Sequence, residues 1–276
     1  GRGRFQRTGR QKTVIKGASG SVEFDLMTKG FGMVLKHCLG GYANTSIAGS
    51  ERKALITPDA NGLAGLSLTT QIGRPSVDGT VRPFTFEGCK VTSWELKNAV
   101  DDKVVLIVNL DAETVGTGTS LATATYASGA EIFAFSECAA TLNGASIALR
   151  EFSIKGENGL DTDRRRLGNT KGQPLAAAFA TISGSLDFEF EDLARYGELV
   201  AGTEVANLIL TFTTPTVISG GGPALFKITI PLLVFSGESP NASGPEIIRE
   251  PMTFIAIDDG TNPVITLEQR TTDTAA

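Results

Sequence analysis

Residues 19–26 read SGSVEFDL, and residues 183–190 read SGSLDFEF. Ser, Gly, Ser and Phe recur at the same places in both octets, and every other position keeps its chemical class. Apolar and acidic side chains alternate along the second half of each octet, which is the two-residue period of a strand with one apolar and one charged face. The chain therefore contains one β unit twice.

A short helix is predicted after each octet. Residues 29–39 carry apolar side chains at helical spacing and end at a pair of glycines, while residues 191–201 form a similar segment that ends at Gly202. Three further strands are expected after each helix. In the first copy the pattern also predicts a loop at 42–62 and separate strands at 81–87 and 90–97, and the end of the chain, 259–276, is expected to be extended and polar.

These repeats predict two tandem, related units of the β-sandwich or β-barrel type, each with one short flanking α-helix. The first unit spans 1–115, a connector of small polar residues spans 116–130, and the second unit spans 131–276. A predicted strand and an Arg-rich loop precede the second octet, but only an Arg-rich segment precedes the first. The first unit is therefore expected to lack its opening strand, which a segment upstream would supply.

Composition favours an all-β fold. Glycine accounts for 32 of the 276 residues, and glycine-rich turns separate short runs of Val, Ile, Thr and Phe. The net charge of -5 disfavours a general nucleic-acid-binding protein, which needs a basic surface, but it allows DNA to pass without being held. The sequence shows no apolar run long enough to span a membrane and no signal peptide.

No enzymatic activity, metal or cofactor is predicted. His37 is the single histidine, and neither a nucleophile motif nor a phosphate-binding glycine loop accompanies it. The acidic pairs at 101–102 and 258–259 are interpreted as solvated turns, because a calcium site needs six or more oxygen ligands. Three widely spaced cysteines, Cys38, Cys89 and Cys138, favour reduced and mostly buried thiols, and hence folding in the cytoplasm.

The acidic side chains of the two octets are the sharpest functional signal. Glu23 and Asp25 share one face of the first strand, and Asp187, Glu189 and the nearby Glu191 share one face of the second. Like charges along a strand repel each other and so destabilise the fold. We therefore interpret these acidic side chains as required for function. We expect these carboxylates to line a lumen through which a phosphate polymer slides. The alternative is an ordinary solvent-exposed face, which more often mixes Lys with Glu.

Two clusters of arginine are candidate contact sites. Three interpretations are open: pairing with acidic surfaces of neighbouring subunits or rings, which would set their register, a solvated loop, or contact with DNA. The residues are Arg4 and Arg7, accompanied by Arg2 and Arg10, in the first cluster, and Arg164, Arg165 and Arg166 in the second.

Several long segments resemble, in order and spacing, the tail tube proteins of long-tailed bacteriophages, especially those that infect actinobacteria. They are KGASGSVEFDLMTKGFGMVLKHCLG, GRPSVDGTVRPFTFEGCKVTSWELK, EFSIKGENGLDTDRR, SGSLDFEFEDLARY and GPEIIREPMTFIAIDDGTNPVITLEQRTTDT, and the resemblance runs over residues 13–274. It implies a structural virion protein of the phage tail, made in the host cytoplasm. Its copies would form rings that stack into a hollow tube, with inner strands joined between subunits so that no sheet edge stays open.

The resemblance also implies partners: further copies of the same chain, a tape-measure protein inside the tube, tail terminator and distal tail proteins at its ends, and double-stranded DNA in transit. Single-copy tube proteins form hexameric rings. Two tube-like units in one chain favour a pseudo-hexameric ring of three chains, with a hexamer of larger subunits as the alternative. The N-terminus departs from the family pattern because it starts late, which leaves its docking arm undefined.

A different class of function is a surface-binding β-sandwich, such as an adhesin or a carbohydrate-binding module. Such a protein would present exposed aromatic side chains, but this chain has one Trp and three Tyr. The sequence therefore favours the structural role.

Overall fold

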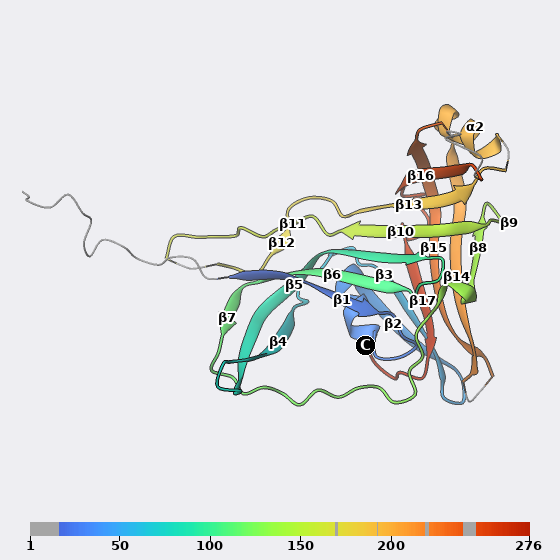
Figure 1. Ribbon diagram of the computed structural model, residues 1–276. Coiled ribbons are helices and arrows are strands. Elements are labelled where there is room, and N and C mark those ends of the chain that lie inside the picture. The colour runs from blue at the N-terminus through green and yellow to red at the C-terminus, as the bar shows by residue number, and fades with distance from the viewer. Residues whose placement is uncertain (1–16, 169–170, 192, 219–220, 240–246) are drawn as a thin grey trace, which may run out of the picture.

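The computed structural model describes residues 17–168, 171–191, 193–218, 221–239 and 247–276, which form a mostly β structure with two short α-helices (Figure 1). The predicted all-β class is confirmed. Arg2, Arg4, Arg7 and Arg10 lie outside the described residues. Within the described residues, neither helix has the length and apolar character required to cross a lipid bilayer.

The first octet forms a strand, and a short helix follows it, as predicted. The helix ends at Gly40, whose backbone N–H bonds to the carbonyl of Lys36 at a φ of 100°. The elements of this half are β1 (Ala18–Asp25), α1 (Gly32–Leu39), β2 (Gly40–Ala48), β3 (Glu51–Pro58), β4 (Leu68–Pro75), β5 (Val81–Ala99), β6 (Val105–Ala112) and β7 (Thr114–Gly116).

Two sequence predictions in this half are wrong. Residues 42–62 are mostly the hairpin of β2 and β3, which turns at Gly49 with a φ of 55°. The small polar residues of β2 resemble those of a loop, because much of this strand is exposed to solvent. Residues 81–97 belong to one long strand, β5, because Gly88 adopts a φ of 65° that permits a bend without ending the strand.

The second half repeats the order of strand, helix and hairpin. The helix after the second octet starts at Ala194 rather than at 191, and it ends at Gly202 in the left-handed conformation, as predicted. The elements are η1 (Phe135–Glu137), β8 (Cys138–Leu142), β9 (Ala145–Ser146), β10 (Leu149–Glu157), β11 (Leu160–Asp161), β12 (Leu175–Ala176), β13 (Thr181–Glu189), α2 (Ala194–Ala201), β14 (Glu204–Val217), β15 (Pro223–Gly237), β16 (Arg249–Ala256) and β17 (Thr266–Thr271).

Strands from both halves join one 15-stranded sheet in the described part of the chain. Its main path runs β1-β6-β5-β10-β13-β16-β15-β14-β8-β9, and the joint between the halves is the antiparallel pair of β5 and β10. β15 turns the corner of the sheet, because its first part pairs with β17 and its last part pairs with β16 (Figure 1). β17 in turn pairs with β3, so the end of the chain joins the second half to the first.

One apolar core lies behind this sheet and contains residues of both halves. Leu35 and Leu106 of the first half belong to it, and so does Phe133 of the second half, which packs against Phe212 and Phe226 with ring centroids 6.4 and 6.0 Å apart. On β10, Gly156 leaves room for the buried ring of Trp94 on the neighbouring β5. The unit boundaries at 115 and 131 stay a prediction, since both sides of the connector share the sheet and the core.

Polar contacts hold the connector and the chain end in place. The side-chain amide of Gln71 donates to the carbonyls of Thr119 and Ser120 and accepts from the N–H of Ala122, at 2.7 Å. Near the chain end, the carboxylate of Asp273 accepts from the N–H of Gly30 at 2.6 Å. Segments without regular structure are thereby fixed to the first half.

Candidate functional site

The acids of the two octets lie on the same face of the continuous sheet. Residues paired across antiparallel strands point to the same side. The register leads from Glu23 through Ile107, Glu95 and Lys155 to Ser183, which begins the alternating series that continues to Asp187 and Glu189. We call the outward-facing side chains of β1, β6, β5, β10, β13 and β16 on this side the polar face.

Most of the predicted acids are neutralised by a cation on the polar face or at its rim. Asp25 accepts from Lys103 at 2.8 Å, Asp187 from Arg249 at 3.2 Å, and Glu189 from Arg150 at 3.2 Å. The hydrogen bond to Asp25 raises the pKa of Lys103. Exposed pairs of this kind contribute little to stability, because water and salt screen their attraction. They set local side-chain geometry more than they set stability.

The polar face therefore mixes charges, which the sequence did not lead us to expect. Neighbouring Glu95 and Lys155 form a further pair at 3.6 Å. Among the described residues, no ion pair involves Glu23, whereas Glu191 is exposed and lies beyond the end of β13. A mixed face also agrees with the alternative of an ordinary solvent surface, so the lumen assignment stays a prediction.

The second arginine cluster lies on a long excursion between β10 and β13, which we call the arm (residues 158–178). Figure 1 shows the arm, with the labels β11 and β12, extending away from β10 and β13 past β1. Arg164 is used inside the arm: its Nη1 donates to the carbonyl of Gln173 at 2.6 Å. Arg165 pairs with Asp163 at 2.6 Å, and Arg166 is exposed. Contacts of the cluster with other subunits remain a prediction.

Two buried lysines lie where the arm meets the first half, and sequence analysis missed both. Lys171 of the arm bonds to the carboxylate of Asp111 and to the carbonyl of Ala112. Lys90 donates to the carbonyl of Leu63 at 2.8 Å, and burial, followed by the charge of Arg164, lowers its pKa. The only signal for Lys90 in the sequence was its place as a charged residue among the apolar residues of a predicted strand.

The remaining candidates have structural surroundings. The Nδ1–H group of His37 donates to the carbonyl oxygen of Met33, 2.8 Å away and one helical turn earlier. Asp259 accepts hydrogen bonds from the side-chain amide of Asn262 and from the backbone N–H groups of Asn262 and Thr261, and these bonds, that of the side chain first, lower its pKa. The described residues contain no group of three potential metal ligands.

All three cysteines are free thiols. Burial raises the pKa of Cys138 to about 11, and it raises the pKa of Cys38 still further. Both thiols are therefore protonated and unreactive near neutral pH.

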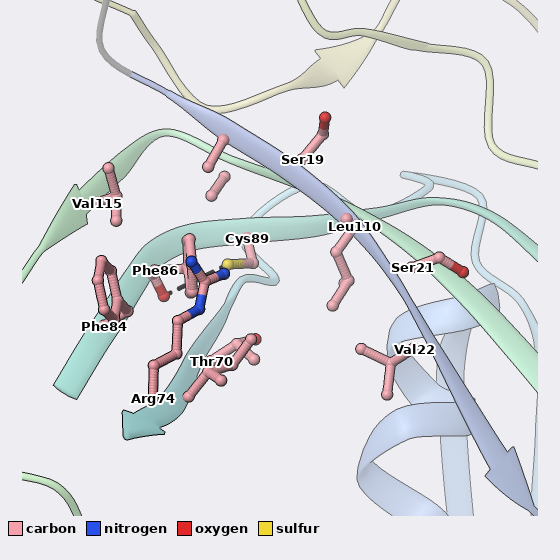
Figure 2. Close-up of a pocket in the computed structure, with 14 residues that line it drawn as sticks. Ser19, Ser21, Val22, Thr70, Arg74, Phe84, Phe86, Cys89, Leu110 and Val115 are labelled. Atoms are coloured by element: carbon pink, nitrogen blue, oxygen red, sulfur yellow. Dashed lines mark hydrogen bonds between the residues drawn. The ribbon is translucent and has the colours of Figure 1, made fainter. Parts of the chain in front are cut away.

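An apolar groove of about 490 Å³ lies between β1 and the hairpin of β4 and β5. Figure 2 shows Val22 and Leu110 pointing into the groove, Phe84 and Thr70 on the opposite wall, and Ser19 and Ser21 pointing away from it. Of the groove's side chains, only that of Arg74 carries a charge, and its guanidinium lies 4.6 Å from the centre of the Phe84 ring. Sequence analysis did not predict the groove, because its walls come from strands distant in the chain.

A family model described as phage tail tube protein matches residues 1–256. A search of curated proteins returned no match.

Proposed function

Because this chain belongs to the phage tail tube protein family, we propose that its copies form rings that stack into a tube and conduct DNA from the capsid into the host cell. The family match covers nearly the whole chain, so the assignment to a structural component of the phage tail does not depend on any one motif. The proposal concerns how this chain builds the tube.

The observation that carries the proposal is the repetition within one sheet. The octet strands β1 and β13 lie in the same sheet, they present the same polar face, and β6 and β16 follow them on the same side. The second repeat follows the first across the strands of the sheet, and a further copy of the chain can extend the sheet in the same direction. Closure of such a sheet into a barrel removes its open edges.

We place the polar face in the bore. It carries both acids and bases, with the acids in a small excess, so it offers the DNA phosphates no strongly attractive surface. The acids on the face and at its rim are the seven carboxylates of Glu23, Asp25, Glu95, Glu151, Glu157, Asp187 and Glu189, and the bases are the five cations of Lys97, Lys103, Arg150, Lys155 and Arg249. A basic surface would hold the phosphates and slow their passage.

We further propose that three chains form one ring, since each chain contains two tube-like units. The exposed Arg166 and the arginines near the N-terminus would contact neighbouring subunits or rings, and the tape-measure protein would occupy the tube during assembly. The tail terminator protein and the distal tail protein would bind at the two ends of the tube.

The test is electron microscopy of the full chain at high concentration, with the mass per ring measured by scanning transmission microscopy. We expect hollow tubes with three chains per ring and the polar face toward the bore. Six chains per ring would contradict the stoichiometry, and a protein that forms neither rings nor tubes would contradict the proposed function.

A further inference from the structure

The outer part of the arm is attached to the rest of the chain mainly at one residue. Near the base of the arm, the side chain of Asn158 donates to two carbonyls of the first half, and Leu160 packs against the core. We call residues 161–176 the outer arm. The only hydrogen bonds that its described residues make to residues outside the arm come from Lys171, which bonds to Asp111 and to a neighbouring carbonyl.

Apolar packing adds little to this attachment. Leu167 is fully exposed, and Leu175 is 40% exposed. A hollow of about 350 Å³ lies beside the attachment point, bordered by Thr162 of the arm on one side and by β1, β5 and β6 on the other. The polar residues of these strands that line the hollow are Ser19, Thr92, Asn109 and Asp111. The outer arm can therefore leave this surface without exposing a large apolar area to water.

The attachment point holds more positive than negative charge. Lys90 on β5 lies opposite Asp111 on β6, and both are buried where the arm meets the first half. Lys90 donates to a single carbonyl, and burial, followed by the charge of Arg164, lowers its pKa. With Lys171, three cations share one buried carboxylate, since the exposed Asp163 is paired inside the arm. Repulsion among the cations opposes closure of the arm, whereas the pair with Asp111 favours it.

The base of the arm is closed by contacts of its own. The carbonyl of Gly159 accepts from the N–H groups of Ala177 and Ala178 at 2.8 and 3.0 Å. Gly159 has a φ of 58°, and a Cβ atom there would lie 2.6 Å from the carbonyl oxygen of Ala178, so no side chain fits in this turn. The outer arm can thus move about its base while β10 and β13 stay paired.

We propose that the outer arm is a strap that opens and closes on the first half of the chain as one unit, with the pair of Lys171 and Asp111 as its lock. Lys90 and Arg164 weaken the lock, because their charges lie close to that of Lys171. The hairpin of β11 and β12 has only two residue pairs, so it does not keep its hydrogen bonds in water once the strap opens. The strap acts within one chain and is independent of ring formation.

The test is hydrogen exchange of the full chain, diluted until it is monomeric. The reporter is the amide of Gly172, which donates to the carbonyl of Arg164 at 2.8 Å inside the arm. Low concentrations of urea should barely change its exchange rate, because opening of the strap exposes little surface. The same urea should clearly accelerate exchange of the β13 amides, which requires unfolding of the sheet. An equal urea dependence at Gly172 and in β13 would overturn the proposal, since the arm would then open only with the sheet.

Three variants examine the lock. Asp111→Asn removes its negative charge and should accelerate exchange at Gly172 about ten-fold or more, with the β13 amides unchanged. Lys90→Gln keeps a hydrogen-bond donor but removes the opposing charge, so exchange at Gly172 should slow about three-fold or more. The matched control is Glu95→Gln, which breaks an exposed ion pair on the polar face and should change exchange at Gly172 less than about two-fold.

Each result decides one part of the proposal. Equal exchange at Gly172 in Asp111→Asn and in the wild type overturns the lock. Faster exchange in Lys90→Gln shows that Lys90 holds the strap closed, which overturns the opposing role of this residue. If Asp111→Asn does not fold, the urea dependence of the wild type still separates a strap that opens locally from an arm that opens with the sheet.

Discussion

Lys171 donates a hydrogen bond to Asp111 across 60 residues of sequence, and both side chains are buried where the arm crosses the end of β6. The pair fixes the arm to the first half of the chain. A second hydrogen bond, from Lys171 to the carbonyl of Ala112 at 3.1 Å, satisfies another proton of the ammonium group. An ion pair in this position costs desolvation but leaves no buried charge unpaired.

Removal of one partner of this pair should destabilise the protein strongly. Lys171→Met leaves the buried Asp111 carboxylate without its cation, so we expect the free energy of unfolding to fall by about 3–5 kcal/mol, as is typical for a broken buried pair. Lys155→Met is the control, since its pair with Glu95 is exposed and should contribute less than about 1 kcal/mol. Urea denaturation measures both. In the double variant Lys171→Met with Asp111→Leu much of the loss should be recovered, and a loss as large as that of the single variant would contradict the assignment.

Gly20 and Gly184, which occupy the same place in the two octets, should differ in their tolerance of a methyl group. Gly184→Ala forces the new Cβ against the backbone of β10 and the Phe254 ring, and such overpacking typically costs about 1–3 kcal/mol. Gly20→Ala meets open space and should change stability by less than about 0.5 kcal/mol. Thermal or urea unfolding compares the two substitutions directly, and equal losses would show that β1 is covered as β13 is.

Acid should weaken the joint between the halves through Glu268. Burial alone would raise the pKa of this carboxyl, but Lys227 of β15 and Lys53 of β3, at 3.3 and 3.2 Å, hold it below the ordinary value of 4.5. A carboxyl with a lowered pKa in the folded state stabilises the fold above its unfolded pKa, and this contribution is lost as the pH falls from about 4.5 through the lower folded pKa. Glu268→Gln should flatten the dependence of stability on pH in that window. An unchanged acid profile in the variant would contradict the role of Glu268.

Charge reversal on the polar face should slow DNA without preventing assembly. Glu23→Lys combined with Asp187→Lys raises the net charge of each chain's contribution to the proposed bore by about four units, and a basic surface retains phosphates. We expect tubes of normal appearance and slower DNA ejection from phage that carry the variant, with a delay that shrinks as salt rises. Val77→Lys, at an exposed hairpin tip away from the polar face, is the control. Ejection at the wild-type rate would contradict the assignment of the polar face to the bore.

Local patterns in the sequence predicted much of the fold. The octets became β1 and β13, helices followed both, and Gly40 and Gly202 ended them, because strand alternation and helix termination depend on residues close in the chain. The hairpin of β2 and β3 was missed, since its small polar side chains lack a strong apolar alternation, and the strand that pairs with β3, β17, lies far away in the sequence. The final strand was likewise only described as extended.

The sequence by itself determined the repeat, the all-β class and the family resemblance. All three depend on short segments and on the order of these segments along the chain. Only the tertiary structure decided that Asp187 meets Arg249, that Lys171 meets Asp111, and that Gly20 lies open where Gly184 is covered. The physical reason is that charge neutralisation and burial depend on which strands become neighbours. The register between distant strands sets those neighbours, and no local pattern records it.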